Sequence, residues 1–223
     1  MAHEDRPMTP APTRIVCSTV AELRALCATG LERTPSARVF DNRLEPPRSD
    51  YDLTSARRSE SRASAVLVPI VARPEGLSVI LMQRPDTMAA HGGQISFPGG
   101  KVDAGDPSPV ETALREAEEE IGLARAHVEV LGFLDSYQVG SGFRIVPVVG
   151  LVTPPFTLTV DAREVVDAFE VPLAFLMDSA NHQKSSREAR GETQWFYAMP
   201  YEGRFIWGAT ANIIRNLFER LAA

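Results

Sequence analysis

From about residue 63 onward, the chain is organised as short hydrophobic runs separated by turn residues. Each run is five to eight residues long. Short apolar runs that are rich in Val, Ile, Leu or aromatic residues and bounded by turn residues are typical of buried β-strands. The predicted strands are residues 65–71, 77–82, 128–134, 145–152, 193–199 and 203–207, the last two forming a hairpin.

Residues 109–121 have the spacing of an amphipathic helix. Ser108 is a favourable N-cap, and Glu111 stands where a capping box places its acidic partner. Gly122 follows the last periodic residue, where a left-handed cap is expected. The apolar residues recur at spacings of four, three and four and therefore lie on one side of the helix: Val110, Leu114, Ala117 and Ile121.

Helical spacing also marks residues 209–221, where the apolar stripe predicts a final helix packed on the core, and residues 19–28. We expect two further helical pieces at 162–169 and 173–176, and a polar surface loop at 184–190. Strands flanked by helices that are distant in sequence predict an α/β fold in which a mixed β-sheet is covered on both faces.

The part of the chain before residue 63 has a different composition. It predicts an N-terminal extension over 1–62, partly disordered, with a short helix capped by Thr19. Residues 41–62 are polar and rich in Pro, Arg and Ser, which fits a linker. They equally fit an arm that packs on the large domain or on a second subunit, as in a homodimer. Residues 63–223 form the large domain.

Composition narrows the classes of function. Hydrophobic residues make up 44% of the chain and charged residues 23%, which is ordinary for a globular protein. The net charge of −6 argues against a nucleic-acid partner, because that role needs a basic surface. We find no apolar stretch long enough for a membrane span and no signal-peptide pattern. The two cysteines, Cys17 and Cys27, suit reduced packing residues, so we expect a cytoplasmic protein with no membrane partner.

Three acidic residues on the predicted 109–121 helix carry the strongest chemical signal. Glu116, Glu119 and Glu120 stand at i, i+3 and i+4, so they are neighbours on the helix surface. Like charges this close repel one another, and a hard divalent cation such as Mg²⁺ or Mn²⁺ relieves the repulsion by binding the carboxylate oxygens. A solvated acidic face is the alternative. The pattern favours a metal-dependent enzyme acting on phosphates, with Arg115 placed to orient the Glu119 carboxylate.

The segment that leads into this helix supports the metal interpretation. Two adjacent glycines, Gly99 and Gly100, permit backbone conformations that other residues avoid and allow close approach to a ligand. The carbonyl of Gly100 can complete the coordination shell of a metal beside the helix. Lys101 follows directly, and it either contacts phosphate or is an exposed charge.

Residues 100–123 resemble the Nudix box, the signature of hydrolases that cleave nucleoside diphosphates linked to another moiety. The second half of that pattern, Arg-Glu-apolar-x-Glu-Glu-x-Gly-apolar, matches at every specified position from Arg115 to Leu123. In the first half, Asp106 stands near the place of the usual glutamate, and the spacing to Arg115 is one residue longer. This variation is similar to the coenzyme A pyrophosphatase branch. Other segments that resemble the branch are 80–84, 91–100, 141–150, 170–173 and 206–211.

The resemblance implies an α/β/α sandwich with a mixed sheet and a requirement for one or more Mg²⁺ or Mn²⁺ ions. A metal-bound water attacks one phosphorus of the diphosphate, so no protein nucleophile is needed. The general base is a box glutamate such as Glu119, or Glu164 in a later segment, which is otherwise a surface charge. The implied metal ligands are Glu116, Glu119, Glu120 and the Gly100 carbonyl.

The same resemblance suggests the substrate. Arg84 and Arg144 lie in branch-like segments and can bind substrate phosphates, unless salt bridges engage them. The favoured reaction converts coenzyme A or acyl-CoA to 3′,5′-ADP and 4′-phosphopantetheine or its acyl form. Pro85 and Ala89 stand where the branch usually has a small residue and an arginine, so ADP-ribose or NADH stays open as a substrate. A non-catalytic ligand-binding module would have no need for the carboxylate cluster.

Overall fold

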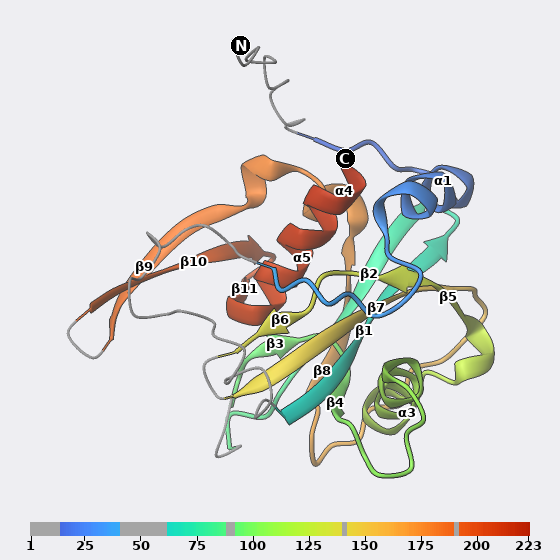
Figure 1. Ribbon diagram of the computed structural model, residues 1–223, viewed down its shortest axis with the longest axis horizontal. Helices are drawn as coiled ribbons and strands as arrows, with labels where there is room; N and C mark the ends of the chain where they lie inside the picture. Colours follow the sequence, from blue (N-terminus) through green and yellow to red (C-terminus); the bar gives the residue numbers. More distant parts are fainter. Residues whose placement is uncertain (1–13, 41–61, 88–91, 140–141, 190–191) are drawn as a thin grey trace, which may run out of the picture.

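The computed structural model describes residues 14–40, 62–87, 92–139, 142–189 and 192–223, whose strands form two β-sheets (Figure 1). The larger sheet has eight strands and the smaller sheet has three. The strands of the larger sheet are β1 (Arg62–Arg73), β2 (Gly76–Gln83), β3 (Ile95–Ser96), β4 (Gly99–Lys101), β5 (Val128–Phe133), β6 (Tyr137–Gln138), β7 (Phe143–Val152) and β8 (Asp167–Pro172).

The larger sheet is mixed, as predicted. Its main path runs β3-β2-β1-β7-β5, while β4, β6 and β8 pair with β1, β7 and β2 respectively. β1 is parallel to β7 and antiparallel to β2. The smaller sheet is antiparallel in the order β11-β10-β9. Its strands are β9 (Gln183–Ala189), β10 (Glu192–Tyr201) and β11 (Arg204–Trp207).

Two short strands, β3 and β4, lie between two central strands, β1 and β2. β1 and β2 pair through only four residues each, next to the turn that joins them. Farther along, β3 pairs with the end of β2, and β4 pairs with the first half of β1. Because β3 and β4 follow one another in the chain, this arrangement places Gly99 and Gly100 between the diverging strands.

Helices cover both faces of the larger sheet, which confirms the predicted layering (Figure 1). Successive side chains of a strand point to opposite faces, so Leu67 joins the apolar cluster under α3 while Val68 joins the cluster under α1 and α5. The helices are α1 (Val20–Gly30), α3 (Pro109–Ile121), α4 (Leu173–Leu176) and α5 (Gly208–Leu221), with 3₁₀ turns η1 (Arg125–His127) and η2 (Ser179–Asn181).

The ends of α3 lie where the sequence predicts them. The Ser108 side chain accepts from the Glu111 amide, and Gly122 ends the helix in the left-handed conformation with φ of 68°. The expected capping box is only half formed, however. The Glu111 carboxylate instead accepts from Arg125 at 2.8 Å, because η1 brings that guanidinium beside the first turn of the helix.

The N-terminal segment 14–40 packs on the rest of the molecule. Helix α1 begins after Thr19, whose capping box with Glu22 is complete. Leu23 and Cys27 on α1 are buried in the larger apolar cluster, and Glu32 pairs with Phe133 of β5 through backbone hydrogen bonds. The remaining residues of the predicted extension, 1–13 and 41–61, lie outside the described residues, so a domain boundary at residue 62 stays a prediction.

Two local predictions are wrong. Residues 162–164 form a turn, and β8 then starts at Asp167, so the expected helix over 162–169 is absent. Val165 is buried while Val166 is 61% exposed, and the Val166 amide already donates to the Gln83 carbonyl of β2 just before β8 begins. The surface loop expected at 184–190 is largely strand β9, paired with β10. Among the described residues, no helix has the length and apolar character needed to cross a membrane.

Candidate active site

Glu120 is the most buried carboxylate of the α3 cluster. Its side chain points under the double glycine, where the Gly99 amide donates to Oε2 at 2.8 Å. The Arg84 guanidinium, at the end of β2, donates to Oε1 at 3.0 Å. Burial outweighs both favourable contacts and raises the pKa of Glu120 to about 7. In such an environment, a neighbouring cation stabilises the ionised form of the carboxylate.

Glu116 lies one turn before Glu120 and directly over Gly100. A Cβ built on Gly100 would overlap the Glu116 carboxylate, so the glycine leaves room for the carboxylate in this position. Burial raises the pKa of Glu116, the neighbouring Arg115 lowers it, and the charges of Glu119 and Glu164 raise it further. The side chain of Glu119 is 60% exposed and completes the predicted triplet at the rim.

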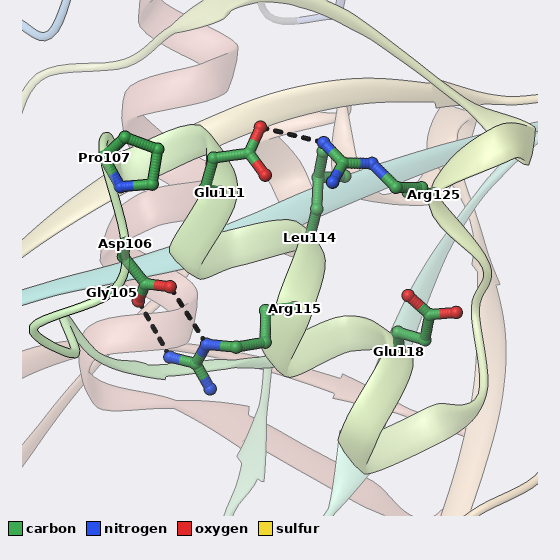
Figure 2. A pocket seen from close by; sticks show the side chains of 8 residues that line it. All are labelled: Gly105, Asp106, Pro107, Glu111, Leu114, Arg115, Glu118 and Arg125. Atoms are coloured by element: carbon green, nitrogen blue, oxygen red, sulfur yellow. Dashed lines mark hydrogen bonds and ion pairs between the residues drawn. The ribbon is translucent and has the colours of Figure 1, made fainter.

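Arg115 orients the two outer carboxylates. Its Nη1 lies 3.1 Å from both Glu116 Oε1 and Glu119 Oε2, as the sequence predicts for Glu119. Asp106 holds the other side of the guanidinium, accepting from Nε at 3.1 Å and Nη2 at 2.9 Å (Figure 2). The Thr112 hydroxyl also donates to Asp106 at 2.9 Å. The Arg115 guanidinium holds the pKa of Asp106 far below its usual range.

These contacts give Asp106 a clear structural role. Its carboxylate holds Nε and Nη2 of Arg115 in place. It also lines a separate cavity of about 280 Å³ beside α3 (Figure 2). Sequence reasoning placed Asp106 near an expected acidic position but did not assign its partner. The sequence holds one signal for the Asp106 contacts. Thr112 and Arg115, three residues apart on α3, face the same side of the helix.

A second cavity, of about 220 Å³, is lined by several of the predicted site residues. The residues that line it are Glu116, Glu119, Glu120, Asp161, Arg163 and Glu164. The structure therefore brings Glu164, one of the two candidate bases, to the box glutamates across more than forty residues of sequence. Asp161 and Arg163 were not singled out from the sequence, although the charged run Asp161-Ala162-Arg163-Glu164 marks the segment.

The donor set fits a hard divalent cation. All the acidic groups offer oxygen ligands, which Mg²⁺ and Mn²⁺ prefer, and the buried carboxylates repel one another without a cation. As the side chains lie, no three of them within the described ranges are arranged to enclose an ion. Arg84 contacts one oxygen of Glu120, and Arg115 contacts one oxygen each of Glu116 and Glu119. A metal that took these same oxygens as ligands would compete with the guanidinium contacts.

The three predicted substrate residues lie in different places. Arg84 pairs with Glu120, so it belongs to the carboxylate site. Arg144 does not line the cavity, and its Nη2 donates to the carbonyls of Ser36 and Ala37 at 3.0 and 3.3 Å, tying β7 to the N-terminal segment.

Lys101 is exposed at the end of β4, one residue after Gly100. Its Nζ lies 5.9 Å from the centre of the Phe143 ring, and the Arg62 guanidinium lies 4.0 Å from the same ring. Two cations therefore gather around one aromatic side chain at this end of the sheet.

Comparison with known proteins adds independent information. Residues 61–196 match the family model described as the NUDIX domain. The protein named Uncharacterized Nudix hydrolase NudL of Yersinia pestis (strain Pestoides F) is 38% identical over 187 residues, which cover 82% of this chain and 94% of that protein. A protein of the same name from Yersinia pseudotuberculosis serotype O:1b (strain IP 31758) gives the same values. A solved NUDIX domain of Shewanella oneidensis NrtR, complexed with ADP ribose, is 20% identical with a TM-score of 0.47, covering 72% of this chain and 88% of that one.

Proposed function

This chain belongs to the Nudix hydrolase family, and we propose that the nucleoside diphosphate derivative it hydrolyses is coenzyme A or an acyl-CoA. The products are then 3′,5′-ADP and 4′-phosphopantetheine or its acyl form. The observation that carries the hydrolytic chemistry is the shared cavity of Glu116, Glu119, Glu120 and Glu164. The choice of coenzyme A is supported by the branch-like segments outside the box, above all 91–100 and 141–150.

The residues of the cavity divide the work of hydrolysis. Glu116, Glu119, Glu120 and the Gly100 carbonyl would hold one or more Mg²⁺ or Mn²⁺ ions, which when bound neutralise phosphate charge and acidify a water. In the hydrolysis, a water attacks one phosphorus, the bond from this phosphorus to the bridging oxygen breaks, and the other phosphate leaves with that oxygen. The attacking water gives its proton to Glu164, or to the exposed Glu119 carboxylate. Arg115, fixed by Asp106, keeps Glu116 and Glu119 in place.

Lys101 and its neighbours offer a site for a further phosphate. Coenzyme A carries a 3′-phosphate on its ribose, and an exposed anion of this kind is bound by charge-assisted hydrogen bonds. Lys101 and Arg62 both lie close to the Phe143 ring. Lys101 directly follows Gly100, the glycine that faces Glu116. In this assignment Lys101 binds phosphate, Arg84 helps to place the diphosphate when its contact with Glu120 loosens, and Arg144 acts through the N-terminal segment.

A second candidate is hydrolysis of ADP-ribose or NADH, which stays open because Pro85 and Ala89 depart from the branch. We also propose a cytoplasmic location, which the two free, buried cysteines suit. A homodimer would use the segment between residues 41 and 62, whose polar composition suits a contact with a second subunit.

Product analysis tests the proposal directly. The purified protein is incubated with CoA, ADP-ribose and NADH, each with Mg²⁺ or Mn²⁺ and with chelator, and the products are identified by liquid chromatography and mass spectrometry. We expect metal-dependent release of 3′,5′-ADP and phosphopantetheine. Cleavage of ADP-ribose or NADH without cleavage of CoA would reject coenzyme A and leave the second candidate.

A further inference from the structure

The loop 159–165 is fixed to the C-terminal end of α3 by its backbone. The last carbonyls of a helix have no partner within the helix. Here the Thr159 amide donates to the carbonyl of Ile121, and the Asp161 amide donates to the carbonyl of Glu120, both at 2.9 Å. Gly122 lets the loop come this close, because a Cβ there would lie 2.9 Å from the Thr159 nitrogen. The loop therefore has a set position relative to the box glutamates.

Within this loop, Asp161 holds Arg163 in place. The Asp161 carboxylate accepts from the Arg163 backbone amide at 3.0 Å and from Nε and Nη2 of its guanidinium at 3.0 and 2.5 Å. The Asp161 carbonyl also accepts from the amides of Glu164 and Val165, which closes a tight turn. Both oxygens of the carboxylate are thus engaged, and one edge of the guanidinium is fixed.

The charges around the cavity show what Arg163 can do. Five carboxylates line it, and of the described lining residues only Arg163 is cationic. Its side chain is 87% exposed, so the edge that Asp161 leaves uncovered is open to solvent and to a ligand. A diphosphate is an anion that must enter this acidic surrounding, and an arginine recognises phosphate oxygens through directed hydrogen bonds.

We propose that Arg163 binds the diphosphate of the substrate, and that Asp161 is the positioning residue for Arg163 and not a metal ligand. The guanidinium donates to a non-bridging phosphate oxygen on the side of the cavity opposite to α3. This inference rests on the hydrolase function but not on coenzyme A as substrate, because all candidate substrates share the diphosphate. It adds a substrate contact from a loop that carries none of the box residues.

The test compares Arg163→Met and Arg163→Lys with Arg24→Met, which removes a half-exposed, ion-paired arginine from α1. Binding of methylenediphosphonate, whose P–C–P bond is not hydrolysed, is measured by calorimetry with Mg²⁺ present. KM and kcat are measured with whichever of CoA and ADP-ribose the wild type cleaves. For Arg163→Met we expect about a tenfold weaker affinity for the diphosphonate and a KM raised by a similar factor. The diphosphonate affinity and KM of Arg163→Lys should lie between those of Arg163→Met and the wild type. Arg24→Met should have the wild-type affinity and KM.

An unchanged affinity and KM in Arg163→Met would overturn the substrate role. The second part of the proposal, that Asp161 is not a metal ligand, is tested by titrating Asp161→Asn and Glu120→Gln with Mn²⁺. We expect the metal affinity to fall in Glu120→Gln only, and a comparable loss in Asp161→Asn would make Asp161 a metal ligand. Failure of the coenzyme A proposal is seen separately, since the wild type would then cleave ADP-ribose or NADH while the diphosphonate measurement still reports on Arg163.

Discussion

The carboxylate of Glu116 occupies the space where Gly100 would carry a side chain. The obstacle is the far end of a flexible residue, so it can move aside if a methyl group appears. At Gly99 the situation differs, because φ is 154° and the obstacle includes the backbone oxygen of Ala65. The two adjacent glycines are therefore needed for different reasons, the first for the fold and the second for the site.

Gly100→Ala should reduce turnover while preserving the fold. The new methyl group displaces the Glu116 carboxylate, and misplacing a group in a catalytic site by about 1 Å costs up to about a hundredfold in rate. Turnover and melting temperature are measured for Gly100→Ala and for Gly105→Ala, a control position where an added methyl group would meet open space. A Gly100→Ala enzyme as active as the control would mean that the position of Glu116 is not critical.

Glu120→Gln should nearly abolish turnover. The amide keeps an acceptor for the Gly99 amide, so the packing survives, but it removes the charge that a divalent cation requires. We expect a loss of at least about a hundredfold in kcat and a melting temperature close to that of the wild type. Glu118→Gln, on an exposed position of the same helix, is the matched control. Equal turnover in Glu120→Gln would refute the metal-site assignment.

Lys101→Met should weaken the selection for a 3′-phosphate. The substrates are CoA and dephospho-CoA, which differ by that group alone. Loss of one charge-assisted contact should raise KM for CoA by about tenfold and leave KM for dephospho-CoA unchanged. Lys101 and Lys184 are the only lysines in the chain, and Lys184 lies exposed on β9, so Lys184→Met controls for the loss of a lysine. Equal effects on both substrates would remove Lys101 from the phosphate site.

The free energy of unfolding should fall below about pH 6.5 through His182. Its Nε2 donates to the Leu176 carbonyl at 2.7 Å, and Arg215 lies 3.3 Å from Nδ1. Burial, with a contribution from Arg215, lowers the pKa of His182 below its ordinary value of 6.5. The unfolded chain therefore binds a proton at a pH where the folded protein does not. In urea denaturation across this range, the free energy of unfolding of the wild type should fall relative to that of His182→Gln as the pH is lowered, and a constant difference would exclude His182 as the source.

Leu23→Ala should destabilise the whole protein. Leu23 on α1 is fully buried in the cluster that also contains Phe218 of α5. Removing a buried leucine side chain costs about 2–5 kcal/mol in the free energy of unfolding. A single denaturation transition at lower urea concentration would show that residues 14–40 fold together with the large domain. A separate early transition would show instead that α1 unfolds by itself.

The sequence predicts best what is decided locally. Ser108 and Gly122 define the ends of α3 because capping depends on residues next to the helix. The spacing of Glu116, Glu119 and Glu120 places them together for the same reason, since a helix fixes its own neighbours. The buried strands β1, β2 and β7 are recognisable because each is a continuous apolar run.

What the sequence does not predict depends on distant partners. Residues 167–169 become a strand because β2 offers an edge to pair with, a fact invisible in the local pattern of Val165, Val166 and Phe169. Arg144 donates to carbonyls that lie more than one hundred residues earlier in the chain. The Arg84–Glu120 pair likewise follows from the arrangement of the sheet and α3, so neither arginine's partner can be read from its neighbours in sequence.

The attachment of the loop 159–165 to α3 has a consequence for how such an enzyme can diversify. Thr159 and Asp161 make this attachment with backbone amides, which every residue except proline possesses. Side chains on the loop can therefore be exchanged without moving the loop backbone. Each new side chain then lies at the same position next to the box glutamates. A library that varies positions 162–164 while keeping Asp161 and Gly122 would sample new chemistry on an unchanged frame.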